Sequence, residues 1–201
     1  MKSSIIKDAM ALTIITLVAG LALGFTNDIT AGPIAQQQQK AKEEAYKAVF
    51  ADANTFEEVK KDDALQSCLD ENGYAAQRID EVMQAVDASG NPIGYAFTVT
   101  TTEGYGGDIQ FAMGVKDDGT LNGISILSIS ETAGLGMKAT TDGFKDQFKD
   151  KKVEKFTYTK SGATSDDQID AISGATITTN AMTNGVNAGL CAFQYEEGGN
   201  N

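Results

Sequence analysis

Three short clusters rich in glycine, serine and threonine carry the residue types best suited to holding a ligand. They occupy residues 103–107, 130–138 and 170–179, and each follows a stretch with the residue pattern of a β-strand. Glycine lets a backbone approach a ligand closely and present its N–H groups. The third cluster leads into an expected helix, whose N-terminus would attract an anion. The clusters therefore predict a phosphate beside Thr176 and a flat organic group held by the other two loops; the alternative is three turns that use glycine for its backbone freedom.

The composition of the chain excludes several classes of chemistry. The 201 residues include no histidine, which rules out Ser-His-Asp and Cys-His catalytic pairs and the usual histidine-containing metal sites. The net charge of −12 argues against nucleic-acid binding, which requires a basic face. The two cysteines, Cys68 and Cys191, are too few to hold an iron–sulfur cluster alone. They could form one disulfide or remain buried free thiols, and the sequence leaves both possibilities open.

The order of residues in the three clusters resembles a known family. Residues 170–176, with the sequence DAISGAT, fit D-x-x-(S/T)-G-A-T, the covalent flavinylation motif of the family of FMN-binding domains. Residues 131–136 (ETAGLG) resemble the E-T-P-G-L-G loop of that family, with Ala133 in place of proline, and residues 105–107 (YGG) resemble its glycine-rich stretch. Over residues 5–193 the chain is similar to the G subunits of Rnf electron-transport complexes. The C subunits of sodium-pumping NADH:quinone reductases have a related domain.

The resemblance implies that FMN is joined through its phosphate to the hydroxyl of Thr176. It also implies that the following residues surround the cofactor: Ser173, Gly174, Ala175, Asp170, Glu131, Thr132, Gly134, Leu135, Gly136, Lys138, Gly106 and Gly107. Some of these have a second interpretation. Asp170 could be recognised by the enzyme that attaches the flavin, or it could be a turn acid that binds local N–H groups. Leu135 could lie against the flavin ring or in the core, and Lys138 could pair with the phosphate or be a solvated lysine.

The resemblance also implies an electron-carrying protein of a larger complex rather than a catalyst acting alone. In an Rnf-type complex it would work with membrane, iron–sulfur and flavin subunits that move electrons between reduced ferredoxin and NAD⁺, coupled to Na⁺ or H⁺ movement. The resemblance also implies a separate flavin transferase that attaches FMN, which agrees with the weak nucleophilicity of threonine and with the absence of a histidine that could act as a base. The alternatives are the C subunit of a Na⁺-translocating NADH:quinone reductase and an anchored binding module without redox function.

The N-terminus has the features of a membrane anchor. Residues 9–25 carry no charge, and the 21 residues from 5 to 25 would span about 31 Å as a helix, close to the thickness of a hydrocarbon core. Lys2 and Lys7 precede the central apolar stretch and Asp28 follows it. The positive-inside rule therefore places the N-terminus in the cytoplasm and the rest of the chain on the periplasmic or extracellular side of the cell membrane. A cleaved signal peptide is the alternative.

The residue pattern predicts an α+β fold, in which an antiparallel sheet of four to seven strands packs against helices. We expect a cytoplasmic tip and transmembrane helix (1–27), a stalk and packing helices (28–75), an FMN-binding domain (76–195) and a frayed tail (196–201). Apolar alternation and polar turns predict a meander of strands at 93–101, 109–115 and 121–129, with further extended segments at 79–86 and 153–159. Helices are expected at 40–50, 141–148 and 178–193, a short polar exit at 27–39, and a helix or mixed segment at 55–72.

Overall fold

The computed structural model describes residues 2–199, and the chain divides into two units between Ala41 and Lys42. The first helix, α1 (Lys2–Val49), is continuous over 48 residues. Within the described part of the chain it is the one helix long and apolar enough to cross a membrane. The short polar exit expected at 27–39 is part of this helix, and Pro33 is accommodated inside α1, where the neighbouring alanine and glutamine residues favour helical geometry.

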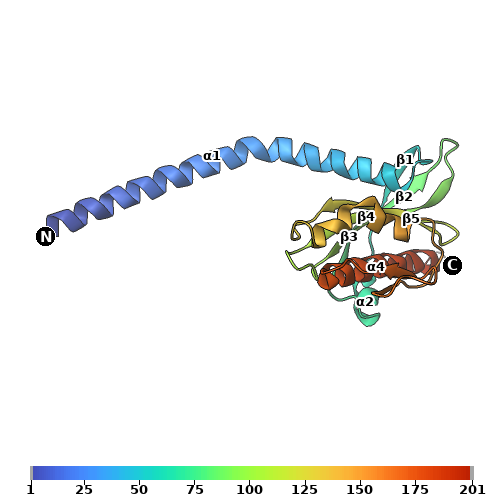
Figure 1. Ribbon diagram of the computed structural model, residues 1–201. Helices are drawn as coiled ribbons and strands as arrows, with labels where there is room; N and C mark the ends of the chain where they lie inside the picture. The colour runs from blue at the N-terminus through green and yellow to red at the C-terminus, as the bar shows by residue number, and fades with distance from the viewer. Residues whose placement is uncertain (1, 200–201) are drawn as a thin grey trace. The chain divides into compact units, whose positions relative to one another are not determined.

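Residues 42–199 form a domain built on a five-stranded antiparallel sheet, whose strands are neighbours in chain order (Figure 1). The strands are β1 (Thr55–Val59), β2 (Gln77–Val86), β3 (Pro92–Thr101), β4 (Ile109–Lys116) and β5 (Leu121–Ser128). The α+β fold and the predicted meander are confirmed. The segment at 55–72 is mixed: the edge strand β1 pairs with β2, and α2 (Ala64–Glu71) follows it.

The elements after the sheet differ more from expectation. They are η1 (Gly136–Thr140), α3 (Asp142–Lys145), η2 (Asp146–Phe148), β6 (Thr157–Thr159), β7 (Gln168–Asp170) and α4 (Thr176–Gly199). The helix expected at 141–148 is divided into α3 and η2. The strand expected at 153–159 is shortened to β6, which pairs in parallel with β7 instead of joining the sheet. Since α4 continues to Gly199, residues 196–199 of the expected frayed tail are helical, and residues 200–201 lie outside the described chain.

Both faces of the sheet are covered. On one face α4 covers the sheet (Figure 1). It packs there against large buried side chains of the central strands, such as Phe97 and Met113. On the other face the last turns of α1 pack against Ala96 and Ala112. Small and large residues therefore alternate along β3 and β4, as the two-residue period of a strand requires. The approach of α4 is close: a Cβ atom on Gly189 would lie 1.9 Å from the sulfur of Met113.

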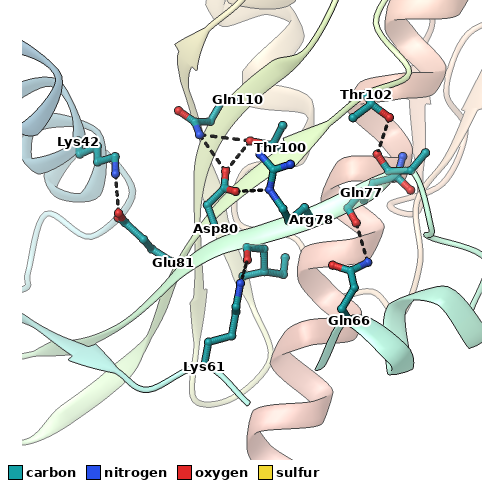
Figure 2. Close-up of polar contacts among 12 residues, drawn as sticks. Lys42, Lys61, Gln66, Gln77, Arg78, Asp80, Glu81, Thr100, Thr102 and Gln110 are labelled. Atoms are coloured by element: carbon teal, nitrogen blue, oxygen red, sulfur yellow. Dashed lines mark hydrogen bonds and ion pairs between the residues drawn. The ribbon is translucent and has the colours of Figure 1, made fainter. Parts of the chain in front are cut away.

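Polar contacts fix the end of α1 on the sheet. Lys42 pairs with Glu81 of β2 (Figure 2), and the Tyr46 hydroxyl donates to the other carboxylate oxygen of Glu81 at 3.0 Å. The same hydroxyl lies 2.6 Å from that of Thr98, a buried residue of β3. These contacts hold the last turns of α1 in one orientation against the domain.

A second polar cluster surrounds Asp80 on β2. Its carboxylate accepts hydrogen bonds from Thr100, Arg78 and Gln110, so residues of three adjacent strands meet at one acid (Figure 2). Partial burial would raise the pKa of Asp80, but the three hydrogen bonds outweigh burial and the pKa is lowered. Asp80 is therefore an anion that joins strands, which is a structural role.

Candidate functional site

The three glycine-rich clusters meet at a groove of about 540 Å³ on the surface of the domain. The groove is lined by Tyr105, Glu131, Thr132, Leu135, Gly136, Gly174, Ala175, Thr176, Ile177 and Thr178. Its volume lies within the range of pockets that hold cofactors and other small molecules. The loops that follow β3, β5 and β7 therefore line one groove.

The third loop delivers the chain to the start of α4. The N–H of Ala175 donates to the carbonyl of Ile172 at 3.0 Å, and Gly174 occupies the left-handed region of this tight turn with φ of 78°. The Thr179 hydroxyl accepts from the N–H of Ile172 at 3.0 Å and donates to the carbonyl of Ala175 at 2.9 Å. Thr176 is thereby fixed as the first residue of a helix of 24 residues, half-buried and lining the groove. The N-terminus of such a helix favours an anion.

Glu131 joins the first two loops. Its carboxylate is buried, and one oxygen accepts hydrogen bonds from the N–H groups of Tyr105 at 2.7 Å and Gly106 at 3.3 Å. The absence of a side chain at Gly136 is required by this packing. A Cβ atom there would lie 2.5 Å from the Thr178 hydroxyl and 2.6 Å from the second oxygen of Glu131. The floor of the groove is thus built by a buried acid, a buried threonine and a glycine that lets them approach.

Exposed apolar side chains line the groove. Among the described residues of the domain, the large apolar side chains that stay exposed are Tyr105 (71%), Ile177 (53%) and Leu135 (42%), and all three lie at this site. Apolar side chains gathered in this way on an otherwise polar surface are typical of a binding site. The groove therefore combines an apolar lining with a helix N-terminus, which suits a ligand that has a flat apolar ring and an anionic group.

The structure brings together seven of the residues predicted for the site and leaves six outside the groove lining. The lining includes Glu131, Thr132, Leu135, Gly136, Gly174, Ala175 and Thr176, and it omits Asp170, Ser173, Gly106, Gly107, Gly134 and Lys138. Gly106 still contributes by donating its N–H to the floor of the groove. Lys138 is an exposed residue of η1.

Asp170 lies at the end of β7, outside the groove lining. Its carboxylate accepts a hydrogen bond from the N–H of Ala163 at 2.6 Å, and its own N–H donates to Gln147. This arrangement is that of an acid that stabilises a neighbouring turn, one of the two interpretations of the sequence.

Three lining residues were missed by the sequence analysis as site residues: Tyr105, Ile177 and Thr178. Tyr105 could have been found, since a tyrosine between glycines in an exposed loop is a sign of binding rather than packing. Ile177 and Thr178 gave no such sign, because they read as ordinary residues of the coming helix.

The domain has no candidate metal centre over the described residues 2–199, where no three His, Cys, Asp or Glu side chains gather. Cys68 of α2 and Cys191 of α4 are free thiols in mutual hydrogen-bond contact. Partial burial and the neighbouring Cys68 thiol raise the pKa of Cys191 to about 11. The thiol pair lies 15 residues, or about 22 Å, along α4 from Thr176, so it is separate from the groove.

Comparison with known proteins gives two family matches along the chain. Residues 104–190 match the FMN-binding domain family, and residues 1–49 match the RnfG N-terminal region. The first match contains all three loops of the groove, and the second ends with α1.

The full-length relatives cover nearly the whole chain. The chain is 32% identical to the G subunit of the Na⁺-translocating ferredoxin:NAD⁺ oxidoreductase complex of Acetobacterium woodii, over 94% of this chain and 92% of that protein. It is 33% identical to the G subunit of the proton-translocating ferredoxin:NAD⁺ oxidoreductase complex of Clostridium ljungdahlii, over 92% and 89%. It is 32% identical to the G subunit of the ion-translocating oxidoreductase complex of Methanosarcina acetivorans, over 96% and 97%.

Two solved structures share the fold. The crystal structure of Shewanella oneidensis NqrC aligns with a TM-score of 0.52 and 18% identity, covering 74% of this chain and 84% of that one. The C subunit of the Na⁺-translocating NADH-quinone reductase of Parabacteroides distasonis aligns with a TM-score of 0.50 and 22% identity, covering 70% and 76%. At these identities the likeness concerns the fold alone.

Proposed function

The chain belongs to the family of G subunits of Rnf-type, ion-translocating oxidoreductase complexes, and we propose that it carries FMN as a phosphoester on Thr176. It is a membrane-anchored electron-transfer protein with an FMN-binding domain. The whole complex would pass electrons from reduced ferredoxin to NAD⁺ and translocate Na⁺ or H⁺, as the names of the relatives state for their complexes. Its partners are the other subunits of that complex.

The observation that carries the proposal is the position of Thr176. Its hydroxyl belongs to the first residue of α4, at a groove lined by Tyr105, Leu135 and Ile177. A phosphate on this hydroxyl would be next to the helix N-terminus, where N–H groups and the helix dipole stabilise negative charge. The apolar side chains would pack on a ring attached to that phosphate and exclude water from it. FMN, when bound, would supply transfer of one or two electrons at a time.

The chain itself offers little to activate Thr176. It has no histidine, and the acid six residues before Thr176, Asp170, is engaged with the N–H of Ala163. An unactivated hydroxyl is a weak nucleophile. We therefore propose that a separate flavin transferase attaches FMN to Thr176.

We propose an orientation in the membrane from the charges on either side of the uncharged stretch of α1, residues 9–25. Lys2 and Lys7 favour a cytoplasmic N-terminus, which places the FMN-binding domain on the exterior side. A covalent link would be useful there, because a cofactor lost from this side would diffuse away. Of the alternatives, the C subunit of a quinone reductase is supported by likeness of fold alone, and a binding module without redox function would carry no flavin.

The test is to express the full-length chain with an active flavin transferase and to measure the mass of the denatured protein. The native chain should gain the mass of one FMN less one water and fluoresce in a denaturing gel. Thr176→Ala should lose both signals and keep the far-ultraviolet circular dichroism of the native chain. Thr176→Ser, which keeps a hydroxyl, is the matched control and should retain label. Covalent FMN on the Thr176→Ala variant would refute the site, and an unmodified native chain would refute the covalent link.

A further inference from the structure

The tyrosine at the edge of the groove is exposed, yet the backbone that carries it is closely packed. Tyr105 is 71% exposed and lines the groove. Glycines flank it on both sides, and neither has room for a side chain. A Cβ atom on Gly104 would lie 2.1 Å from the carbonyl oxygen of Gly107, and one on Gly106 would lie 2.0 Å from that of Ser130. This loop therefore presents its aromatic ring from a fixed backbone, as a preorganised binding site does.

Glu103 ties the same loop to α4. One oxygen of its carboxylate accepts a hydrogen bond from the side-chain amide of Asn184, in α4, at 2.8 Å. That oxygen accepts a second bond, also at 2.8 Å, from the side-chain amide of Gln77, the buried first residue of β2. Hydrogen bonds to a carboxylate are stronger than those between neutral groups. Glu103 is thus a firm link between the loop, the sheet and the helix.

The helix at the other end of this link presents the proposed acceptor. Thr176 is the first residue of α4, and Asn184 lies eight residues later, about 12 Å along the helix axis. Glu103 is two residues before Tyr105, and Glu131 holds the other side of the loop through the N–H of Tyr105. The two acids therefore fix the aromatic wall of the groove relative to the helix that would hold the phosphate.

We propose that Glu103 is a positioning residue for the flavin: by tying its loop to α4, it holds the ring of Tyr105 against the FMN ring. This inference rests on the proposed attachment of FMN to Thr176. Glu103 does not line the groove, so it acts through Tyr105. Aromatic rings attract each other in stacked or edge-to-face contact, which requires that both rings are held in place. The phosphate would hold one end of the cofactor, and the loop would hold its flat end.

A contact between Tyr105 and the flavin has its own optical signal. An excited flavin takes an electron from a phenol ring in contact with it, and the electron then returns, so the fluorescence of the flavin is quenched. The ring of phenylalanine is much harder to oxidise and does not quench. The chain has no tryptophan, and over the described residues 2–199 Tyr105 is the tyrosine that lines the groove. Quenching of a flavin on Thr176 would therefore report the position of Tyr105.

The test is to co-express the full-length chain with the flavin transferase and to compare the fluorescence of the attached FMN before and after unfolding in urea. Because the link is covalent, the unfolded sample holds the same number of flavins without the contact. Tyr105→Phe keeps the ring and removes the quencher, so it should raise the ratio of native to unfolded fluorescence several-fold. Glu103→Ala should raise this ratio about two-fold, because the released loop moves away from the ring part of the time. Glu103→Gln, whose amide oxygen can still accept from Asn184, should stay near the native ratio.

A second set of variants separates positioning from a general loss of structure. In the Tyr105→Phe background, Glu103→Ala should leave the fluorescence ratio unchanged, because no quencher remains to be moved. A general loosening of the groove would instead change the ratio in both backgrounds. Asn184→Ala removes the same link from the side of the helix and is the second variant if Glu103→Ala does not fold. It should raise the ratio only when Tyr105 is present.

Each failure has a distinct result. An unchanged ratio in Tyr105→Phe would overturn the proposal, since it would mean that the tyrosine faces solvent or a partner protein instead of the flavin. An unchanged ratio in Glu103→Ala and Asn184→Ala, or equal changes with and without Tyr105, would overturn the positioning role. A native chain without FMN on Thr176 would overturn the proposed function and this inference with it.

Discussion

Replacing Glu131 by alanine should loosen the first loop of the groove. The buried carboxylate accepts one short hydrogen bond from the N–H of Tyr105 and one longer bond from the N–H of Gly106, at 2.7 and 3.3 Å. Hydrogen bonds to a charged group contribute about 1.5–3 kcal/mol each, and the longer bond falls at the weak end. Because both N–H groups lie near the surface and can recover water, we expect Glu131→Ala to lower the free energy of unfolding by about 2–3 kcal/mol.

The assay is urea unfolding of the full-length chain in detergent, monitored by tyrosine fluorescence. The chain is expressed without the transferase, so that no cofactor contributes to its stability. Glu131→Gln is the matched control, since its amide oxygen can still accept from the N–H of Tyr105. It should cost about 1 kcal/mol, as a neutral acceptor is weaker than a charged one. A change below about 0.5 kcal/mol for Glu131→Ala would refute the reasoning, because it would mean that the acid does not hold the two loops together.

Three further predictions follow from contacts outside the groove. Gly189→Ala places a Cβ atom 1.9 Å from a methionine sulfur of β4 and should destabilise the domain by about 1–3 kcal/mol in the same urea assay. Gly198→Ala is the control and should not destabilise the domain, because a Cβ atom at Gly198 would have no atom within 4 Å. Asp80 has a pKa below its ordinary value of 3.8, so the stability that it contributes is present above that pH and is lost as the pH falls through the lowered pKa. Asp80→Asn should therefore weaken the loss of stability below about pH 4, and an unchanged loss of stability at acid pH would contradict this. A thiol-specific oxidant should link Cys68 to Cys191 within one chain with the loss of two hydrogens, whereas dimers joined through either cysteine would argue against their contact. At pH 8 iodoacetamide should label Cys191 more slowly than it labels free cysteine, because the pKa of Cys191 is about 11.

The sequence allowed the central sheet to be predicted because its signals are local. The strands at 93–101, 109–115 and 121–129 alternate in residue character and are joined by short polar segments, and the structure has β3, β4 and β5 at nearly the same bounds. The edge strand β1 could not be predicted this way. Its charged sequence is compatible with a helix, and it is extended because it pairs with β2, a contact between segments far apart in the chain.

The same distinction applies to the helices. Gly32 and Pro33 weaken the local helical signal, but α1 continues through them because two residues that weaken a helix are outweighed by the long helical segments on either side. At the other end, Gly185 and Gly189 weaken the local signal of α4, but these glycines let the helix approach Phe111 and Met113 of the sheet. Their value is visible only once the packing is known.

The loops of the groove were predictable from the sequence, and the contacts that build the groove were not. The residue order of the three clusters identified the loops, and the fold brings all three to one groove. The sequence could not reveal that Glu131 accepts from the N–H of Tyr105, or that Asp170 accepts from the N–H of Ala163, because each hydrogen bond joins segments that only the fold places side by side. The residues of the groove that were missed are those whose role depends on which loops are neighbours.

The most direct test of the account is the mass of this chain isolated from its own membrane complex, denatured and cleaved before aspartate. The account predicts an excess of one FMN less one water on the C-terminal fragment that begins at Asp170 and contains Thr176. An unmodified fragment, or FMN attached to any other residue of the native chain, would contradict it.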